Sequence, residues 1–70
     1  MTLEEKLQLI ERALKVEPNT LTANTKLAEV AEWDSLSILN LQIEFSVLRP
    51  GLLFENLYEC KTVGELCEMI

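Results

Sequence analysis

The spacing of apolar residues near the start of the chain predicts an amphipathic helix. Thr2 stands three residues before Glu5, the spacing of a capping box, and Pro18 follows the last periodic residue. The sequence therefore predicts a helix over residues 3–16. Its apolar face recurs at steps of four, three and four residues, with charged residues between: Leu3, Leu7, Ile10 and Leu14.

Residues 17–33 show no sustained period. They contain one proline, two asparagines and three threonines, with Leu21, Leu27 and Val30 scattered among them. This composition favours a long ordered loop that the three apolar residues pin to the core. Loops of this length usually carry function.

The segment after Asp34 is apolar on most of its circumference, and Asp34 offers a helix N-cap. A polar stripe is made only by Ser37, Asn40 and Glu44, at spacings of three and four. The pattern predicts a central helix that is exposed to solvent along this stripe and buried elsewhere. The helix is expected to end at Arg49-Pro50-Gly51. Its apolar residues are Leu36, Ile38, Leu39, Leu41, Ile43 and Phe45.

The last third of the chain predicts one or two short turns within residues 52–59, and then a short helix. Thr62 and Glu65 repeat the capping-box spacing before the apolar residues of that helix. No strand-like alternation competes with these helices. We therefore expect one all-α domain over residues 1–70, a small four-helix-type bundle with three main helices and a short third helix or turn.

Composition and charge narrow the functional classes. The chain is 49% hydrophobic and 26% charged, which is typical of one globular domain, and a domain of 70 residues rarely encloses a roomy catalytic cavity. Six basic against twelve acidic residues give a net charge of −6. That charge disfavours nucleic acid and favours a basic protein partner. No apolar run is long enough to insert into a membrane, and the first residues do not resemble a signal peptide, so we expect a cytoplasmic monomer.

The chain contains few of the residue types that catalysis or metal binding requires. The chain has no histidine and two cysteines, Cys60 and Cys67, so His-dependent triads and His-containing zinc sites are absent from it and no metal site is predicted. In a reducing cytosol we expect the cysteines to be two small buried hydrophobes and not a disulfide. The sequence therefore indicates a protein that is not an enzyme.

The most informative position is Ser35, directly after the capping Asp34. A serine at a helix start should expose its hydroxyl, and no general base lies near it in the sequence. Another protein would have to activate it. On these residues alone, an ordinary helix start is the simpler interpretation.

Taken across nearly its full length, the chain resembles the acyl and peptidyl carrier proteins. Asp34-Ser35-Leu36 stands half-way along the chain, at the start of a mostly apolar helix, as the family's modified serine does. Leu27 matches an anchoring leucine of the family's first loop. Two further landmarks are in register: Phe45, Val47 and Pro50, similar to the family's Phe-x-Ile-x-x-Pro exit, and Thr62-Val63-Gly64-Glu65-Leu66, similar to its Thr-Val-x-Asp/Glu-Leu opening.

This resemblance implies an acyl-carrier-protein-like bundle in which Ser35 is the attachment point of 4′-phosphopantetheine. A phosphopantetheinyl transferase would join the arm to Ser35 covalently from coenzyme A, and Asp34 would help to position the metal of that transferase. The arm would then carry an acyl or aminoacyl group as a thioester. An activating ligase and downstream transferases are the partners so implied.

The chain also departs from the carriers of fatty-acid synthesis, whose second helix is rich in acidic residues. Here Ser37 and Asn40 occupy positions that resemble acidic ones there, so the recognition face is largely neutral. The acidic residues expected to contribute to docking are Glu29, Glu32 and Asp34. Trp33, directly before the motif, is a feature in which the chain resembles carriers that are loaded by an adenylating ligase. Packing of the loop explains this tryptophan equally well. We therefore expect a carrier of a dedicated pathway. The alternatives are a small acidic helical adaptor without a prosthetic group and a divergent fatty-acid carrier. The expected partner-binding residues are Trp33, Leu36, Ser37, Leu39, Asn40, Ile43 and Glu44.

Overall fold

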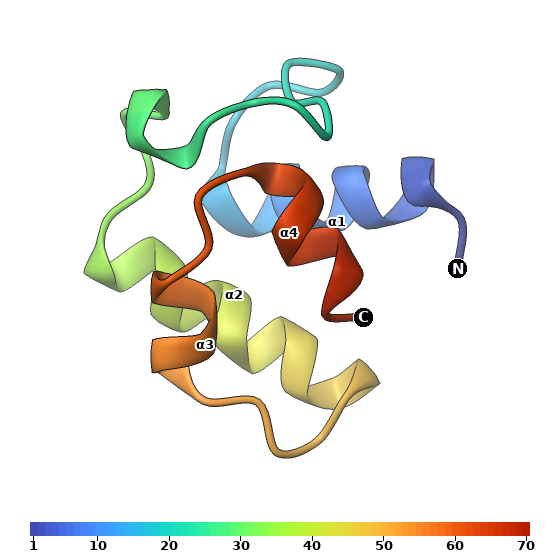
Figure 1. The fold of residues 1–70 in the computed structure, drawn as a ribbon. Coiled ribbons are helices and arrows are strands. Elements are labelled where there is room, and N and C mark those ends of the chain that lie inside the picture. The colour runs from blue at the N-terminus through green and yellow to red at the C-terminus, as the bar shows by residue number, and fades with distance from the viewer.

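The computed structural model describes residues 1–70 and contains helices but no strand, as expected for an all-α domain (Figure 1). Helix α2 packs against α1 on one side and α3 on another, and α4 packs against α1. No helix is both long enough and apolar enough to cross a bilayer. The elements are α1 (Leu3–Leu14), the 3₁₀ turn η1 (Leu27–Glu29), α2 (Ser35–Leu48), α3 (Phe54–Tyr58) and α4 (Val63–Glu68).

Helix α1 begins as predicted and ends earlier. The Thr2 amide donates to Glu5 Oε1 at 3.0 Å, and the Glu5 amide donates to Thr2 Oγ1 at 3.2 Å, so the capping box is confirmed. The predicted end at residue 16 is wrong, because Lys15 turns into the left-handed region with φ 61°. The amides of Lys15 and Val16 then donate to the carbonyls of residues 12 and 11, which is the Schellman arrangement that closes a helix.

The inner face of α1 holds one charged residue beside its buried apolar residues. Glu11 is 3% exposed. Its Oε2 accepts the amides of Thr20 and Leu21, both at 3.0 Å, and these bonds offset the cost of burying a carboxylate. Glu11 therefore ties the start of the long loop to α1. Its burial is not indicated by the spacing of the apolar residues.

Helix α2 is capped as predicted, but its burial differs from the prediction. Asp34 Oδ1 accepts the Ser37 amide at 2.9 Å, and the core face consists of Ile38, Leu41 and Phe45. The expectation that the helix is buried everywhere outside its polar stripe is wrong, because its neighbours cover one side only and no element remains to cover the other. A second apolar strip therefore faces solvent. Its members are Leu36, Leu39, Ile43 and Val47, which are 69%, 46%, 60% and 80% exposed.

The C-terminal third forms two short helices around a tight connection. The Leu53 amide donates to Asn56 Oδ1 at 2.9 Å at the start of α3. At the start of α4, Thr62 Oγ1 accepts the Glu65 amide at 3.3 Å. Glu65 Oε2 accepts the amide of Lys61 and not that of Thr62, so this N-terminus has only one half of a capping box.

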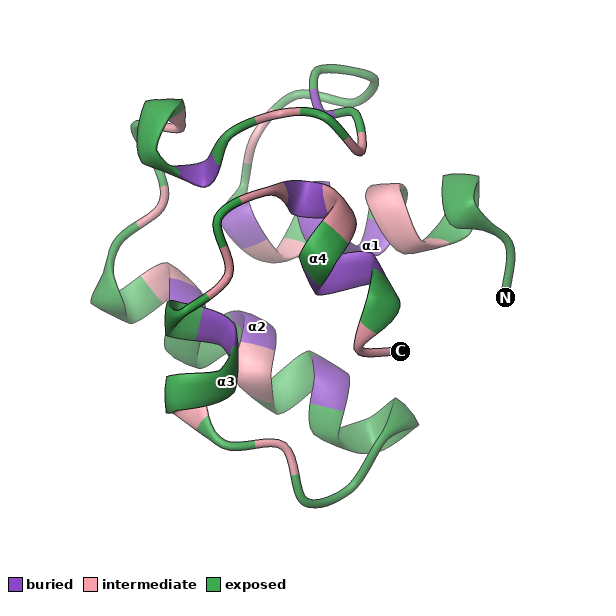
Figure 2. Ribbon diagram, in the orientation of Figure 1, coloured by how far each residue is buried: buried purple, intermediate pink, exposed green.

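The core is formed by buried residues of all four helices, which are coloured purple in Figure 2. Loop residues Leu21 and Leu27 join it and Val30 is half-buried, so the prediction of a pinned loop is confirmed. The side chains that are less than 2% exposed are Phe45, Ile10, Leu14, Leu27, Ile38, Leu41, Leu57, Leu66 and Val63.

The long loop is also bonded to the α3–α4 connection. Lys26 and Thr62 form an isolated antiparallel bridge, and the Leu27 amide donates to the Lys61 carbonyl at 2.9 Å. The Gly64 amide donates to the Ala23 carbonyl at 2.9 Å, and a Cβ at Gly64 would lie 2.8 Å from that oxygen. Glycine permits this approach. The bridge holds the loop against residues far along the chain and so shapes a groove between the loop and the α3–α4 connection.

Candidate functional site

Ser35 is the first residue of α2, and its side chain is exposed, as the sequence predicts. The preceding Asp34 caps the helix through the Ser37 amide. This hydrogen bond, with the helix N-terminus behind it, holds the pKa of the Asp34 carboxyl below its usual value. Asp34 is therefore a carboxylate at neutral pH, exposed beside Ser35.

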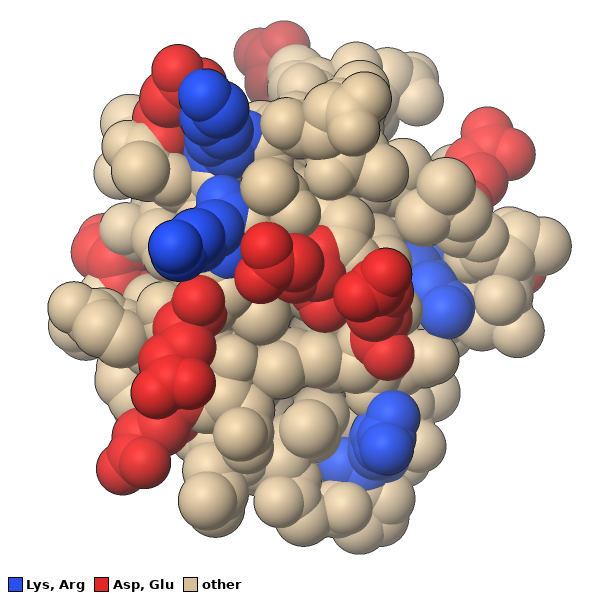
Figure 3. All heavy atoms as spheres, viewed as in Figure 1, with Lys and Arg blue, Asp and Glu red and all other residues tan.

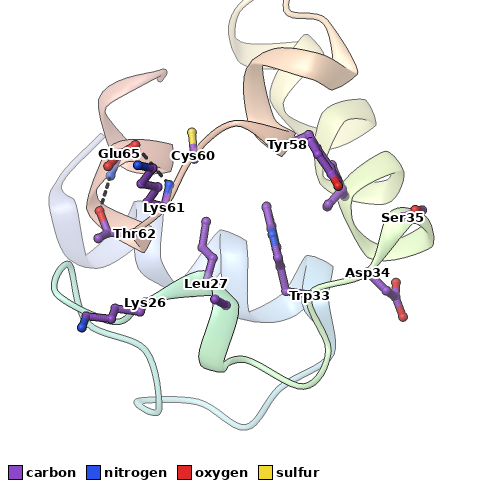
Figure 4. Close-up of a pocket in the computed structure, with 12 residues that line it drawn as sticks. Lys26, Leu27, Trp33, Asp34, Ser35, Tyr58, Cys60, Lys61, Thr62 and Glu65 are labelled. Atoms are coloured by element: carbon purple, nitrogen blue, oxygen red, sulfur yellow. Dashed lines mark hydrogen bonds between the residues drawn. The ribbon is translucent and has the colours of Figure 1, made fainter.

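A surface groove of about 910 Å³ begins beside Ser35. It runs between the loop that precedes α2, the first turn of α2 and the α3–α4 connection (Figure 4). Asp34 and Ser35 lie at one end, with the Asp34 carboxylate turned outward, and Lys61 and Glu65 lie toward the other. The apolar part of the lining consists of Leu27, Ala28, Trp33, Ile38, Tyr58 and Cys60.

Trp33 packs within the loop, which is one of the two interpretations that the sequence left open. Its half-buried side chain packs against the hydrophobic core, and it also lines the groove. In Figure 4 the indole points from the loop into the space between Leu27 and Tyr58. Loop packing thus holds the ring in place as a wall of the groove.

The groove also contains residues that sequence reasoning missed. Tyr58, at the end of α3, is 61% exposed and points into the groove (Figure 4). Cys60, Lys61 and Thr62 follow in the α3–α4 connection. They lie about 25 residues after Ser35 in the sequence, and only the proximity of the Thr62 motif to this stretch could have pointed to them.

The cysteines are free thiols, and no disulfide joins them. Cys67 is buried as predicted, whereas Cys60 is half-buried and lines the groove. Burial raises the pKa of the Cys60 thiol to about 11, with Glu65 and Glu59 adding to the shift. The thiol is therefore protonated at neutral pH and a weak nucleophile. It donates to the Asn56 carbonyl at 3.4 Å.

No base lies beside the Ser35 hydroxyl. Lys26 and Lys61 line the same groove, but in Figure 4 both lie on the far side of Trp33 from Ser35, and the Lys26 amine points away. Asp34 is occupied in capping. The arrangement supplies an exposed hydroxyl next to a carboxylate, which an incoming enzyme would have to activate.

The remaining predicted partner-binding residues lie along α2. Leu36, Leu39 and Ile43 belong to the exposed apolar strip, and Asn40 and Glu44 are exposed next to it. Ser37 is half-buried and is the least accessible residue of the predicted set on α2.

The polar stripe faces a shallow depression toward α1, where Arg12 and Lys15 lie close to Asn40, Ile43 and Glu44. Arg12, in the last turn of α1, and Lys15, directly after that helix, were not singled out from the sequence.

Charge elsewhere is unevenly spread. Glu29, Glu32 and Asp34 are all exposed on the stretch leading to Ser35. On the face shown in Figure 3, acidic and basic side chains gather in a few groups between broad uncharged areas. No described protein family, no curated protein and no solved structure matches this chain, so its function is argued from its residues and their geometry.

Proposed function

We propose that the chain is an acyl-carrier-type protein that carries an acyl or aminoacyl group as a thioester on a 4′-phosphopantetheine arm attached to Ser35. The observation that carries the proposal is the exposed hydroxyl of Ser35 at the first position of α2, directly after the capping carboxylate of Asp34. The groove beside Ser35 gives an attached arm an adjacent surface on which to lie.

The attachment needs chemistry that a partner supplies. The Ser35 oxygen would attack the phosphorus next to the pantetheine of coenzyme A, and the bond between the two phosphates would break. Adenosine 3′,5′-bisphosphate would leave, and the serine proton would pass to a base of the transferase. The exposed Asp34 carboxylate is a hard oxygen ligand suited to the transferase's magnesium. Its capping bond fixes where that carboxylate stands relative to Ser35.

The family landmarks have structural roles that support the same proposal. Leu27, the loop anchor, is 1% exposed, and Phe45, at the exit of α2, is fully buried. Thr62 caps α4. Leu27, Phe45 and Thr62 thus help to hold the bundle around α2, whereas two other residues that carry the resemblance, Leu36 and Val47, are 69% and 80% exposed.

The outward face of α2 supports docking to enzymes of a dedicated pathway. An activating ligase and downstream transferases would contact the apolar strip, which begins one residue after Ser35. Glu44 is the only acidic residue between Leu36 and Leu48, so electrostatic capture by the basic enzymes of fatty-acid synthesis would be weak.

Two other functions fit part of these observations. An adaptor without a prosthetic group would use the same apolar strip to bind a partner and would leave Ser35 unmodified. A divergent fatty-acid carrier would be modified and would serve fatty-acid synthase enzymes. A different experiment tests each of these two alternatives.

Intact mass separates the carrier from the adaptor. The protein is incubated with coenzyme A and a promiscuous phosphopantetheinyl transferase. We expect the wild-type chain and the control Ser46→Ala to gain one arm, and Ser35→Ala to gain none while its circular dichroism is unchanged. Ser46 is a matched control because it is exposed on the same helix. An unmodified wild-type chain, or a modified Ser35→Ala chain, would contradict the proposal.

Loading by a malonyl transferase of fatty-acid synthesis separates the two kinds of carrier. We expect low kcat/KM for the phosphopantetheinylated wild-type chain. Ser37→Asp combined with Asn40→Glu should raise it, since added carboxylates increase the rate of encounter with a basic enzyme. A wild-type chain that is loaded as well as the enzyme's own acidic carrier would identify a divergent fatty-acid carrier.

A further inference from the structure

The packed interior limits what the protein can hold. Most core side chains of the four helices are less than 2% exposed, and none of the five main depressions is a closed cavity. A long alkyl chain would have to push well-packed side chains apart in order to enter, which is costly in a close-packed core. A group carried at Ser35 can rest on the surface or in the groove without disturbing this packing.

The groove offers aromatic walls. The Trp33 indole stands in it from the loop side, and the Tyr58 ring points into it from the end of α3 (Figure 4). The Tyr58 ring stacks on Phe54 with centroids 5.9 Å apart and planes 21° apart, so Phe54 supports it from one side. Beneath them, Leu27 and Ile38 supply an apolar floor.

We infer that this groove is the resting site of the carried group, and that the group is small, flat and aromatic; the inference rests on the proposed attachment of an arm to Ser35. A flat ring in an open groove can cover both of its faces against aromatic walls, and stacking adds to the area it buries. A linear chain in the same groove would leave much of its length in water.

The position of Ser35 makes the groove reachable. Ser35 lies at its rim, so a flexible arm anchored there can fold back over Trp33 instead of extending into solvent. At the far end, Thr62 and Lys61 offer polar groups to a hydroxyl or carboxylate substituent on a ring. Tethering also raises the local concentration of the ring, so that modest stacking is enough to populate the folded-back state.

The test compares two carried groups, one with a flat ring and one with a puckered ring. The transferase loads Ser35 from benzoyl-coenzyme A or from cyclohexanecarbonyl-coenzyme A, whose rings have the same number of carbons. Trp33 is the only tryptophan of the chain, so its fluorescence reports on the groove. The rate of cleavage of each thioester by hydroxylamine is divided by that of the same acyl-coenzyme A, because a benzoyl thioester is intrinsically less reactive than a cyclohexanecarbonyl thioester. We expect the benzoyl arm to change Trp33 emission and to have a ratio roughly two- to tenfold lower than that of the cyclohexyl arm.

Variants at Tyr58 separate binding in the groove from other effects. Tyr58→Ala should remove the difference between the two arms, and Tyr58→Phe, which keeps the ring, should retain it. Because Tyr58 is 61% exposed, both variants should fold. The inference is overturned if the two arms behave alike, or if the arm with a free thiol already gives the full change in Trp33. Absence of any arm by intact mass would instead overturn the proposed function, and the inference with it.

Discussion

Helices α1 and α2 pack against each other, yet they differ in what they show to solvent. The outward side of α1 is mainly charged and polar, including Glu4, Glu5, Gln8 and Arg12. The outward side of α2 is a strip of leucine, isoleucine and valine opposite its core face. A bundle of this size needs only one apolar face on each helix. The second apolar face of α2 therefore serves no packing purpose within the chain, and this is why the proposed docking surface is assigned to α2.

The largest contrast is between the two sides of α2 itself. Phe45 is fully buried and Val47, two residues on, is 80% exposed. Phe45→Ala should lower the free energy of unfolding by about 3–5 kcal/mol, and Val47→Ala should change it by less than about 0.5 kcal/mol. Urea denaturation followed by circular dichroism measures both. Phe45→Leu, with an expected loss under about 1.5 kcal/mol, serves if Phe45→Ala does not fold. Equal losses at the two positions would remove the distinction between inner and outer faces.

The inner face of α1 can be tested at its one charged residue. Glu11→Ala leaves the amides of Thr20 and Leu21 without their acceptor and should cost about 1–3 kcal/mol of unfolding free energy. Glu11→Gln should cost less, since both amides bond to a single oxygen that a glutamine carbonyl can replace. If Glu11→Ala is as stable as the wild-type chain, the carboxylate is not what holds the loop.

The helix starts could be predicted from the sequence, whereas the end of α1 could not. The starts of α1, α2 and α4 were predicted from Thr2, Asp34 and Thr62, because each cap bonds an amide only three residues away. The end of α1 was not, because Lys15 in the left-handed region leaves no glycine as a signal.

Exposure on α2 could not be predicted, since apolar spacing reports which residues share a face and not whether another element covers that face. The site was predictable at Asp34 and Ser35, where the chemistry is local. The groove was not, because the pairing of Lys26 with Thr62 brings its walls together across 36 positions of sequence.

The outer strip of α2 is expected to affect encounter and not stability. Leu39→Ser with Ile43→Ser should reduce kcat/KM for arm transfer by the phosphopantetheinyl transferase about tenfold, as loss of apolar anchors from an interface does. The matched change Gln8→Ser on α1 should leave the rate unchanged. Thermal unfolding should shift little in either variant. An unaltered transfer rate in the α2 variant would show that this partner does not use the strip.

The smallest effect concerns the charge of the Asp34 cap. Its carboxyl pKa in the folded chain lies below the ordinary value of 3.8. Folding therefore gains stability above that value and loses it as the pH falls through the lower folded pKa. Asp34→Asn keeps a capping oxygen but does not titrate. The wild-type chain should then lose more melting temperature than the variant between about pH 5 and about pH 2. Parallel curves would mean that the cap contributes no charge effect.

The central claim, that Ser35 carries the arm, is tested most directly by locating the arm on the chain. After reaction with coenzyme A and the transferase, the protein is digested and the peptide that contains residues 34–37 is fragmented in a mass spectrometer. The account predicts one 4′-phosphopantetheine, placed on Ser35 and absent from Ser37 and Ser46. An arm on either of those serines, or none under conditions in which a known carrier is fully modified, would contradict it.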